Sequence, residues 1–232
     1  MKPFFWTCLL ILLSLVGVYL ALDLPVWNKN SHYSLSESPE LKLLFERKIS
    51  EGNLTFPAGA MEIWLSGADR PIQWKKKSGL FYITREKGQF RFGGHKESWD
   101  WVKLKPLDGK FKYNNMNYEG ELWLYPVDDS HFSIVLGLEI EKYIAKVISQ
   151  EMSSHWPLET LKAQAIAARS FAHYHKEKNE GKSFHLLMGP QAQAIRGEAP
   201  SQEAIDATFL TYGMVLKQSE KTLLAYYHST CG

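Results

Sequence analysis

The sequence contains little cysteine, with only Cys8 and Cys231 among its 232 residues. Two cysteines cannot form a disulfide framework, so the chain must fold around an apolar core instead. A strong charge of either sign is also missing, since 27 Lys and Arg face 25 Asp and Glu and the formal net charge is +2. The densest basic run is the short stretch "WKKK" at 74–77. This balance argues against a nucleic-acid partner.

Internal repeats and low-complexity tracts are absent as well. What remains is an ordinary globular composition, with 45% hydrophobic and 22% charged residues, and enough length for one large domain or two small ones. Aromatic residues are frequent at 13%, including eight Trp. Aromatic faces can stack on sugar rings, but in a strand-rich chain most of them pack in the core.

One long uncharged run occupies the N-terminus. Lys2 precedes a stretch from Pro3 to Leu22 without a charge, and a helix of about twenty residues spans roughly 30 Å, the thickness of a bilayer core. The run is long for a signal peptide, and no clean cleavage site follows it. We expect residues 1–23 to be an uncleaved membrane anchor with the remainder outside the cytoplasm. Secretion after signal cleavage is the alternative.

The rest of the chain divides by pattern. Residues 24–39 are polar and turn-rich and predict a linker. Short strand-like segments separated by Gly, Pro, Asp and Asn fill residues 40–117 and continue to about 138. Helical patterns follow, and a hairpin is expected at the end; the helices are predicted over 140–152, 157–178 and 202–212. The fold class is therefore α+β, with a strand-rich N-terminal half before a helical core and a C-terminal β-hairpin.

A glutamate interrupts the apolar stripe of the first helix. The stripe consists of Ile140, Ile144, Val147 and Ile148. Glu151 falls within the stripe, four residues after Val147. A carboxylate that points toward a core is costly unless it is paired, hydrogen-bonded or protonated. Glu151 is therefore either a satisfied structural acid or a tuned catalytic one.

Five segments of the second half occur in a recognisable order. They are "YEGELWLYP" at 118–126, "LEIEKYIAKVISQEM" at 138–152, "WPLETLKAQAIAARSFA" at 156–172, "AIDATFLTYGMVL" at 204–216 and "AYYHSTCG" at 225–232. Together they resemble the motifs of the SpoIID/LytB family, exported bacterial cell-wall proteins named after the stage II sporulation protein D. The resemblance covers residues 118–232, which we expect to form the catalytic domain. Because the chain stops before the second Gly and the Thr of the closing motif, we expect a shortened member or a fragment.

The resemblance implies an enzyme, a lytic transglycosylase that cuts the glycan strands of peptidoglycan to 1,6-anhydro-N-acetylmuramic acid ends. Glu151 matches the family's catalytic acid. A general acid must be protonated near neutral pH, and the apolar stripe would favour that form by burial. Gln164 and Arg169 match family positions as well. The resemblance implies that they orient Glu151 or hold the sugar, and the alternative is that they simply tie their helix to the following loop.

Three further residues are candidates for binding the sugar. His228 and Ser229 match the closing motif and could line the same cleft, although a histidine at a strand end is more often simply hydrogen-bonded. Trp156 could wall the pocket or stack on a sugar, and the alternative for it is a core position.

Neither a cofactor nor a metal ion is expected. His228 and Cys231 have the spacing of a ligand pair, and His185 is the remaining candidate ligand in the loop. The segment "LLMGPQAQAIRG" at 186–197 lacks the Asp, Cys and His that several family members carry there, so the usual minimum of three zinc ligands is not reached.

Two other functional hypotheses compete with the hypothesis of an enzyme. The first is a non-catalytic glycan-binding protein that enhances a separate cell-wall amidase, and the second is an anchored scaffold for a wall-remodelling complex. The expected partners are therefore peptidoglycan glycan strands, other wall hydrolases or amidases, and the membrane.

Overall fold

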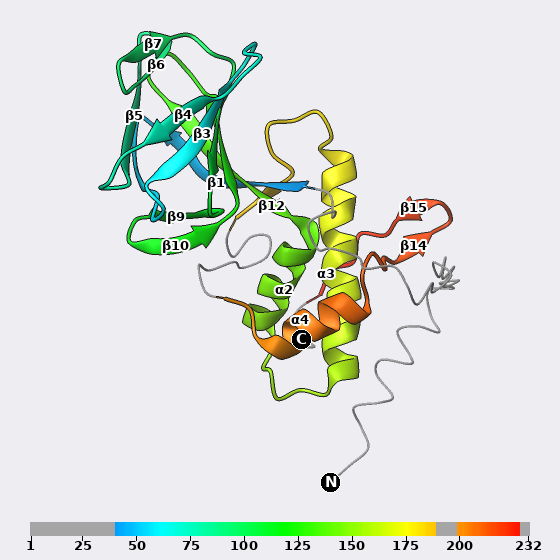
Figure 1. Cartoon of the computed structure of the whole chain (residues 1–232). Coiled ribbons are helices and arrows are strands. Elements are labelled where there is room, and N and C mark those ends of the chain that lie inside the picture. The colour runs from blue at the N-terminus through cyan, green and yellow to red at the C-terminus, as the bar shows by residue number, and fades with distance from the viewer. Residues whose placement is uncertain (1–39, 189–198, 228–232) are drawn as a thin grey trace.

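The structure, a computed structural model, describes residues 40–188 and 199–227 (Figure 1). The expected anchor at 1–23 and linker at 24–39 lie outside these residues, as do His228, Ser229 and Cys231. In the described part of the chain, no helix combines the length and the apolar character that crossing a membrane requires.

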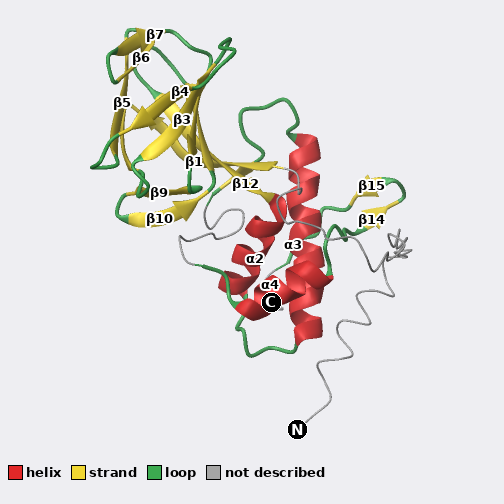
Figure 2. Ribbon diagram, in the orientation of Figure 1, coloured by secondary structure: helices red, strands yellow, loops and turns green. Residues whose placement is uncertain are grey.

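The α+β prediction is confirmed, with a strand-rich body beside a group of helices (Figure 2). The larger sheet has the order β13 (Leu186–Leu187), β1 (Glu40–Ile49), β12 (Phe132–Glu139), β11 (Glu121–Pro126), β8 (Val102–Pro106), β3 (Ala60–Leu65) and β4 (Ile72–Lys75). The smaller sheet has the order β10 (Met116–Glu119), β9 (Lys110–Tyr113), β2 (Glu51–Thr55), β5 (Leu80–Glu86), β6 (Gln89–Phe92) and β7 (His95–Glu97). Every printed pairing in these two sheets is antiparallel except that of β1 with β13.

Aromatic side chains join the two sheets. The strands bury alternate residues, as in β5, where Phe81 and Ile83 are buried between exposed or half-buried neighbours. Phe90 of the smaller sheet meets Phe132 of the larger one edge to face, with ring centroids 5.5 Å apart. Phe45 meets Phe111 at 6.4 Å in the same way. Much of the aromatic content is therefore core, as we expected for a strand-rich chain.

The central strand β12 leads straight into the helices. All seven residues from Phe132 to Leu138 are buried, because β12 lies between β1 and β11 in the middle of the larger sheet. β12 ends at Glu139, and α2 (Ile140–Glu151) begins at the next residue. Since β1 pairs with both β12 and β13, the larger sheet contains strands from both sides of the expected domain boundary at residue 118.

Three helices follow within the described residues: α2, α3 (Leu158–Lys178) and α4 (Gln202–Leu210). Small residues on α3, Ala165, Ala168 and Ala172, are fully buried, which lets the neighbouring helices approach closely. Ser201 caps α4 as predicted, since its side chain accepts a hydrogen bond from the backbone N–H of Ala204 at 3.2 Å. Pro157, expected as the first residue of α3, is instead its N-cap.

The predicted hairpin is present but short. It consists of β14 (Lys217–Gln218) and β15 (Lys221–Thr222), which stand out beside α3 in Figure 1. The described residues after Thr222 are not paired in a strand.

Candidate functional site

Glu151 is the last residue of α2, and its side chain is exposed. The stripe of Ile140, Ile144, Val147 and Ile148 is buried as predicted, but the prediction that it also buries Glu151 is wrong. The reason is that the backbone leaves the helix at Met152, which is extended with φ −134 and ψ 144. The final turn therefore lies at the open end of the helix. Among the described residues, the Glu151 carboxylate has no hydrogen bond or ion pair.

A tyrosine on the same face of α2 was not singled out from the sequence. Tyr143 precedes Glu151 by eight residues, and Val147 lies between them, so the i, i+4, i+8 spacing could have identified it. Its side chain is buried, and its hydroxyl has no hydrogen-bond partner in the described part of the chain. Burial raises the pKa of Tyr143 well above its ordinary value, and the charges of Tyr227 and Glu151 raise it further. The Tyr143 phenol is therefore neutral at physiological pH.

Trp156 lies in the turn between α2 and α3. Its side chain is 48% exposed, so the alternative that placed it in the core is wrong. Its backbone N–H donates to the carbonyl of Ser153 at 3.1 Å, which tightens the turn. Leu158, at the start of α3, is 41% exposed. An uncovered aromatic ring and an uncovered apolar side chain thus follow Glu151 closely along the chain.

Arg169 has no exposed surface, and it pairs with Glu141 rather than with Glu151. Its Nε and one terminal nitrogen donate to the two carboxylate oxygens of Glu141 at 2.8 and 2.7 Å. The same guanidinium donates to the carbonyl oxygens of Thr208 and Met214 at 3.3 and 3.1 Å. These contacts fit the alternative in which Arg169 ties its helix to other segments, and they leave it no surface for a sugar.

Gln164 is half-buried on α3. Its position between the buried Leu161 and Ala168 places it at the edge of the packed face. No contact of its side chain bears on either of its predicted roles, and both stay predictions. The roles predicted for His228 and Ser229 also stay predictions, because these two residues lie outside the described part of the chain.

The other carboxylates near the motif have partners. Glu139 accepts a hydrogen bond from Lys142 at 3.2 Å, and Glu159 accepts one from Lys162 at 2.9 Å. Glu141 is held by Arg169. Within α2 and the first turn of α3, as the structure describes them, Glu151 is therefore the carboxylate that is left without a partner and open to solvent.

The described residues contain no group of three or more side chains that could hold a metal ion. His185, the candidate third ligand, accepts a hydrogen bond at Nδ1 from the backbone N–H of Lys42 at 3.0 Å. Burial, together with the charges of Lys176 and Lys42, lowers the pKa of His185 to about 4. Its imidazole is therefore neutral at pH 7, with one nitrogen already engaged.

Glu151 lines neither of two hollows in the described structure. The larger, of about 680 Å³, lies where the β8–β9 and β10–β11 turns meet the junction of β12 and α2. The smaller, of about 330 Å³, lies between strands β1, β11 and β12 and the segment that precedes β13. The candidate acid thus lies on an open surface.

Comparison with known proteins supports the resemblance to the SpoIID family. Residues 128–217 match the model of the SpoIID family, described as stage II sporulation protein. An uncharacterized protein of Brachyspira hyodysenteriae is 35% identical over 136 residues, which cover 56% of this chain and 36% of that protein. The chain thus spans little more than a third of the length of this curated relative. No solved structure matches the chain significantly. Residues 128–217, which include α2, α3, α4 and Glu151, are thus similar to the SpoIID family, whose members are associated with the degradation of peptidoglycan.

Proposed function

We propose that this protein is a lytic transglycosylase that acts on the glycan strands of peptidoglycan, with Glu151 as the general acid and base. One observation carries the proposal. Within α2 and the first turn of α3, which lie in the family-matched segment, Glu151 is the carboxylate that is both exposed and unpartnered among the described residues. A group that must exchange a proton with a polymeric substrate needs this access.

In the proposed reaction, Glu151 donates a proton to the oxygen of the glycosidic bond as that bond breaks. The 6-hydroxyl of the same sugar then attacks C1, and the Glu151 carboxylate accepts its proton. Because the attacking group belongs to the reacting ring, its effective concentration is high without a protein side chain to place it. A glycan bound over Glu151 excludes water from the carboxyl, and a carboxyl outside water favours its neutral form.

The number of available carboxylates supports transglycosylation over hydrolysis. A glycoside hydrolase normally uses two acids that flank the bond. The other acids of this region are engaged, since Glu141 is buried against Arg169 and Glu159 pairs with Lys162. A transglycosylase needs only one carboxyl, which is what this region offers.

Two aromatic side chains support the assignment. The exposed ring of Trp156, five residues after Glu151, offers an apolar face for a sugar ring. The Tyr143 hydroxyl is buried and neutral, so it adds no second negative charge to the face of α2 that carries Glu151.

The substitution Glu151→Gln tests the proposal. Gln keeps the shape but cannot donate a proton of suitable acidity, so release of soluble fragments from purified glycan strands should fall by about 10²- to 10⁴-fold. Glu159→Gln is the matched control, because it removes an exposed carboxylate close along the chain and should keep full activity. Unchanged cleavage by a folded Glu151→Gln protein would contradict the role of Glu151.

A second candidate function is favoured by the open position of Glu151 outside both hollows. On this alternative the protein binds glycan without cutting it, and it either enhances a separate cell-wall amidase or holds a wall-remodelling complex together. Glycan binding without fragment release, combined with faster release by an added amidase, would favour this candidate over the enzyme.

A further inference from the structure

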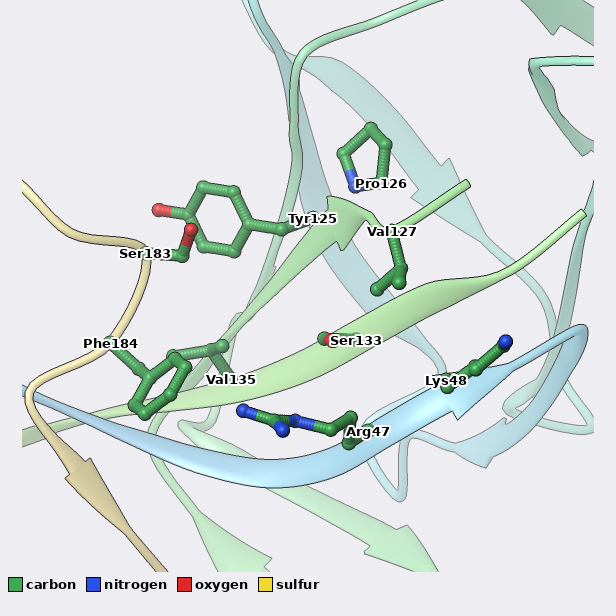
Figure 3. A pocket seen from close by; sticks show the side chains of 9 residues that line it. All are labelled: Arg47, Lys48, Tyr125, Pro126, Val127, Ser133, Val135, Ser183 and Phe184. Atoms are coloured by element: carbon green, nitrogen blue, oxygen red, sulfur yellow. The ribbon is translucent and has the colours of Figure 1, made fainter. Parts of the chain in front are cut away.

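The smaller hollow is lined by positively charged, apolar and hydroxyl side chains. It opens between three strands of the larger sheet and the segment before β13, and Figure 3 shows the nine side chains that line it. Its volume of about 330 Å³ lies at the lower end of the range for small-molecule sites. No carboxylate is among the lining residues, whereas two cations are, Arg47 and Lys48.

The two cations are not equivalent. Lys48 lies 3.7 Å from a carboxylate oxygen of Asp128, so its charge is partly neutralised. Arg47 is exposed and makes no hydrogen bond or ion pair within the described part of the chain. In Figure 3 its guanidinium extends toward Phe184, whereas the amine of Lys48 points away. The hollow therefore presents one uncompensated guanidinium, which suits a single carboxylate because its planar fork matches that group.

The other lining side chains divide into apolar groups and hydroxyls. Phe184, beside the Arg47 guanidinium, and Val127 supply apolar surface, whereas Val135 is fully buried beneath them. Ser133 and Ser183 add hydroxyl groups that can donate to or accept from a peptide amide. A free phosphate ion would leave the apolar surface unused, whereas a carboxylate next to a small alkyl side chain would use both parts.

The wall of the hollow is held in place by hydrogen bonds. The backbone N–H of His185 donates to the carbonyl of Lys42 at 2.8 Å, and the side chain of Asn179 donates to the carbonyl of His185 at 2.8 Å. On the opposite side, the Tyr125 hydroxyl accepts a hydrogen bond from the amine of Lys42 at 3.1 Å. A site that is formed before its ligand arrives loses less entropy on binding.

We propose that this hollow binds the free terminal carboxylate of a peptidoglycan stem peptide, with Arg47 pairing with the carboxylate and the apolar wall contacting the side chain of the terminal residue. The assignment of the peptide to peptidoglycan rests on the proposed function. Binding of the peptide in this hollow would add a second contact with the wall polymer, so that the strand-rich body holds its peptide while the helices bind its glycan.

Binding is measured by calorimetric titration of the full chain, kept in mild detergent, with N-acetyl-D-alanyl-D-alanine and with its C-terminal amide. The free acid should bind saturably, and the amide should bind at least about tenfold more weakly, since a charge-assisted hydrogen-bond pair is lost. Arg47→Gln should weaken binding of the acid to the same extent. Lys77→Gln, which removes an exposed cation outside the hollow, is the matched control and should leave binding unchanged.

Ser183→Trp provides a second test, because Ser183 is exposed and a large ring there should fill the hollow without disturbing the core. Its far-ultraviolet circular dichroism should match that of the parent, and its peptide binding should be lost. Equal binding of acid and amide, unchanged binding in folded Arg47→Gln, or equally tight binding of inorganic phosphate would each overturn the inference. The titration involves no glycan cleavage, so its outcome is independent of the Glu151→Gln experiment.

Discussion

At the scale of single residues, His185 is the titratable group whose surroundings most clearly set its charge. Burial and two lysines lower its pKa from 6.5 to about 4. In the unfolded chain it takes up a proton as the pH falls below about 6.5, whereas in the folded protein it resists protonation down to about 4. Its contribution to stability is therefore complete above pH 6.5 and is lost progressively as the pH falls through 4.

We therefore expect the free energy of unfolding to fall between pH 7 and pH 5, and to fall less steeply in His185→Gln. Urea unfolding at a series of pH values measures this slope. His155→Gln is the control, because His155 is exposed in the turn before α3 and should leave the slope unchanged. A His185→Gln protein with the slope of the parent would show that other groups carry the pH dependence.

Two glutamates of α2 show how far the sequence could define the site. Helical periodicity placed Glu151 in the apolar stripe, yet Glu151 is exposed, whereas Glu141 of the same helix is buried. Periodicity gives the angle of a side chain around the helix, but not how far along the axis the neighbouring elements extend. The family motif located Glu151, whereas the partner of Glu141 could not be predicted, because Arg169 meets it only through tertiary packing.

At the scale of elements, the Glu141–Arg169 pair joins all three described helices. Arg169 lies on α3, Glu141 lies in the first turn of α2, and the guanidinium also reaches the carbonyl oxygen of Thr208 on α4. Both side chains are closed off from solvent. Removal of one partner leaves an uncompensated buried charge, whereas replacement of both by apolar groups is far less costly.

Arg169→Met should accordingly lower the free energy of unfolding by about 3–5 kcal/mol. The double variant Glu141→Leu/Arg169→Met should recover much of this loss, because no charge is left buried. Chemical denaturation of the three proteins measures the effect. Lys162→Met, which breaks the exposed pair with Glu159, serves as the control and should cost no more than about 1 kcal/mol. A double variant as unstable as Arg169→Met would contradict the argument from buried charge.

The elements themselves were predicted with uneven success. Helices with caps and strands with alternating burial carry local signals, and both α4 with its Ser201 cap and the strand-rich character of the first half were predicted from them. The order of the strands in the sheets was not predicted, because strand pairing depends on contacts between residues that are far apart in the sequence. β13 is an example, since two residues carry no periodicity and only the parallel pairing with β1 defines them.

At the scale of the whole molecule, the product of the reaction separates the proposed chemistry from hydrolysis. If Glu151 acts as proposed, we expect fragments that end in 1,6-anhydro-N-acetylmuramic acid, because Glu151 is the one unpartnered carboxyl within the described α2 and first turn of α3, and a hydrolase normally uses two. Mass spectrometry distinguishes these fragments, since an anhydro end is lighter than a hydrolysed end by one water. Label incorporated from heavy-oxygen water would instead mean hydrolysis and a second acid elsewhere in the molecule.

We propose in addition that the N-terminal run holds the protein in the membrane and that the described residues act outside the cytoplasm. The length of the uncharged run from Pro3 to Leu22 supports this. The intact mass of the native protein should include these residues, and the protein should remain in the membrane fraction after a high-salt wash. A mature N-terminus near residue 23 would instead mean a secreted protein.

The direct passage from β12 into α2 affects which parts of the chain can exist alone. A shortened chain that began at residue 118 would retain β12 but lose β1, its partner along one entire edge. The seven buried residues of β12 would then border an open row of backbone N–H and C=O groups, and such edges associate with one another into aggregates. The family-matched helices are therefore not a module that evolution or an engineer can move between proteins by themselves, because the first strand of the sheet has to move with them.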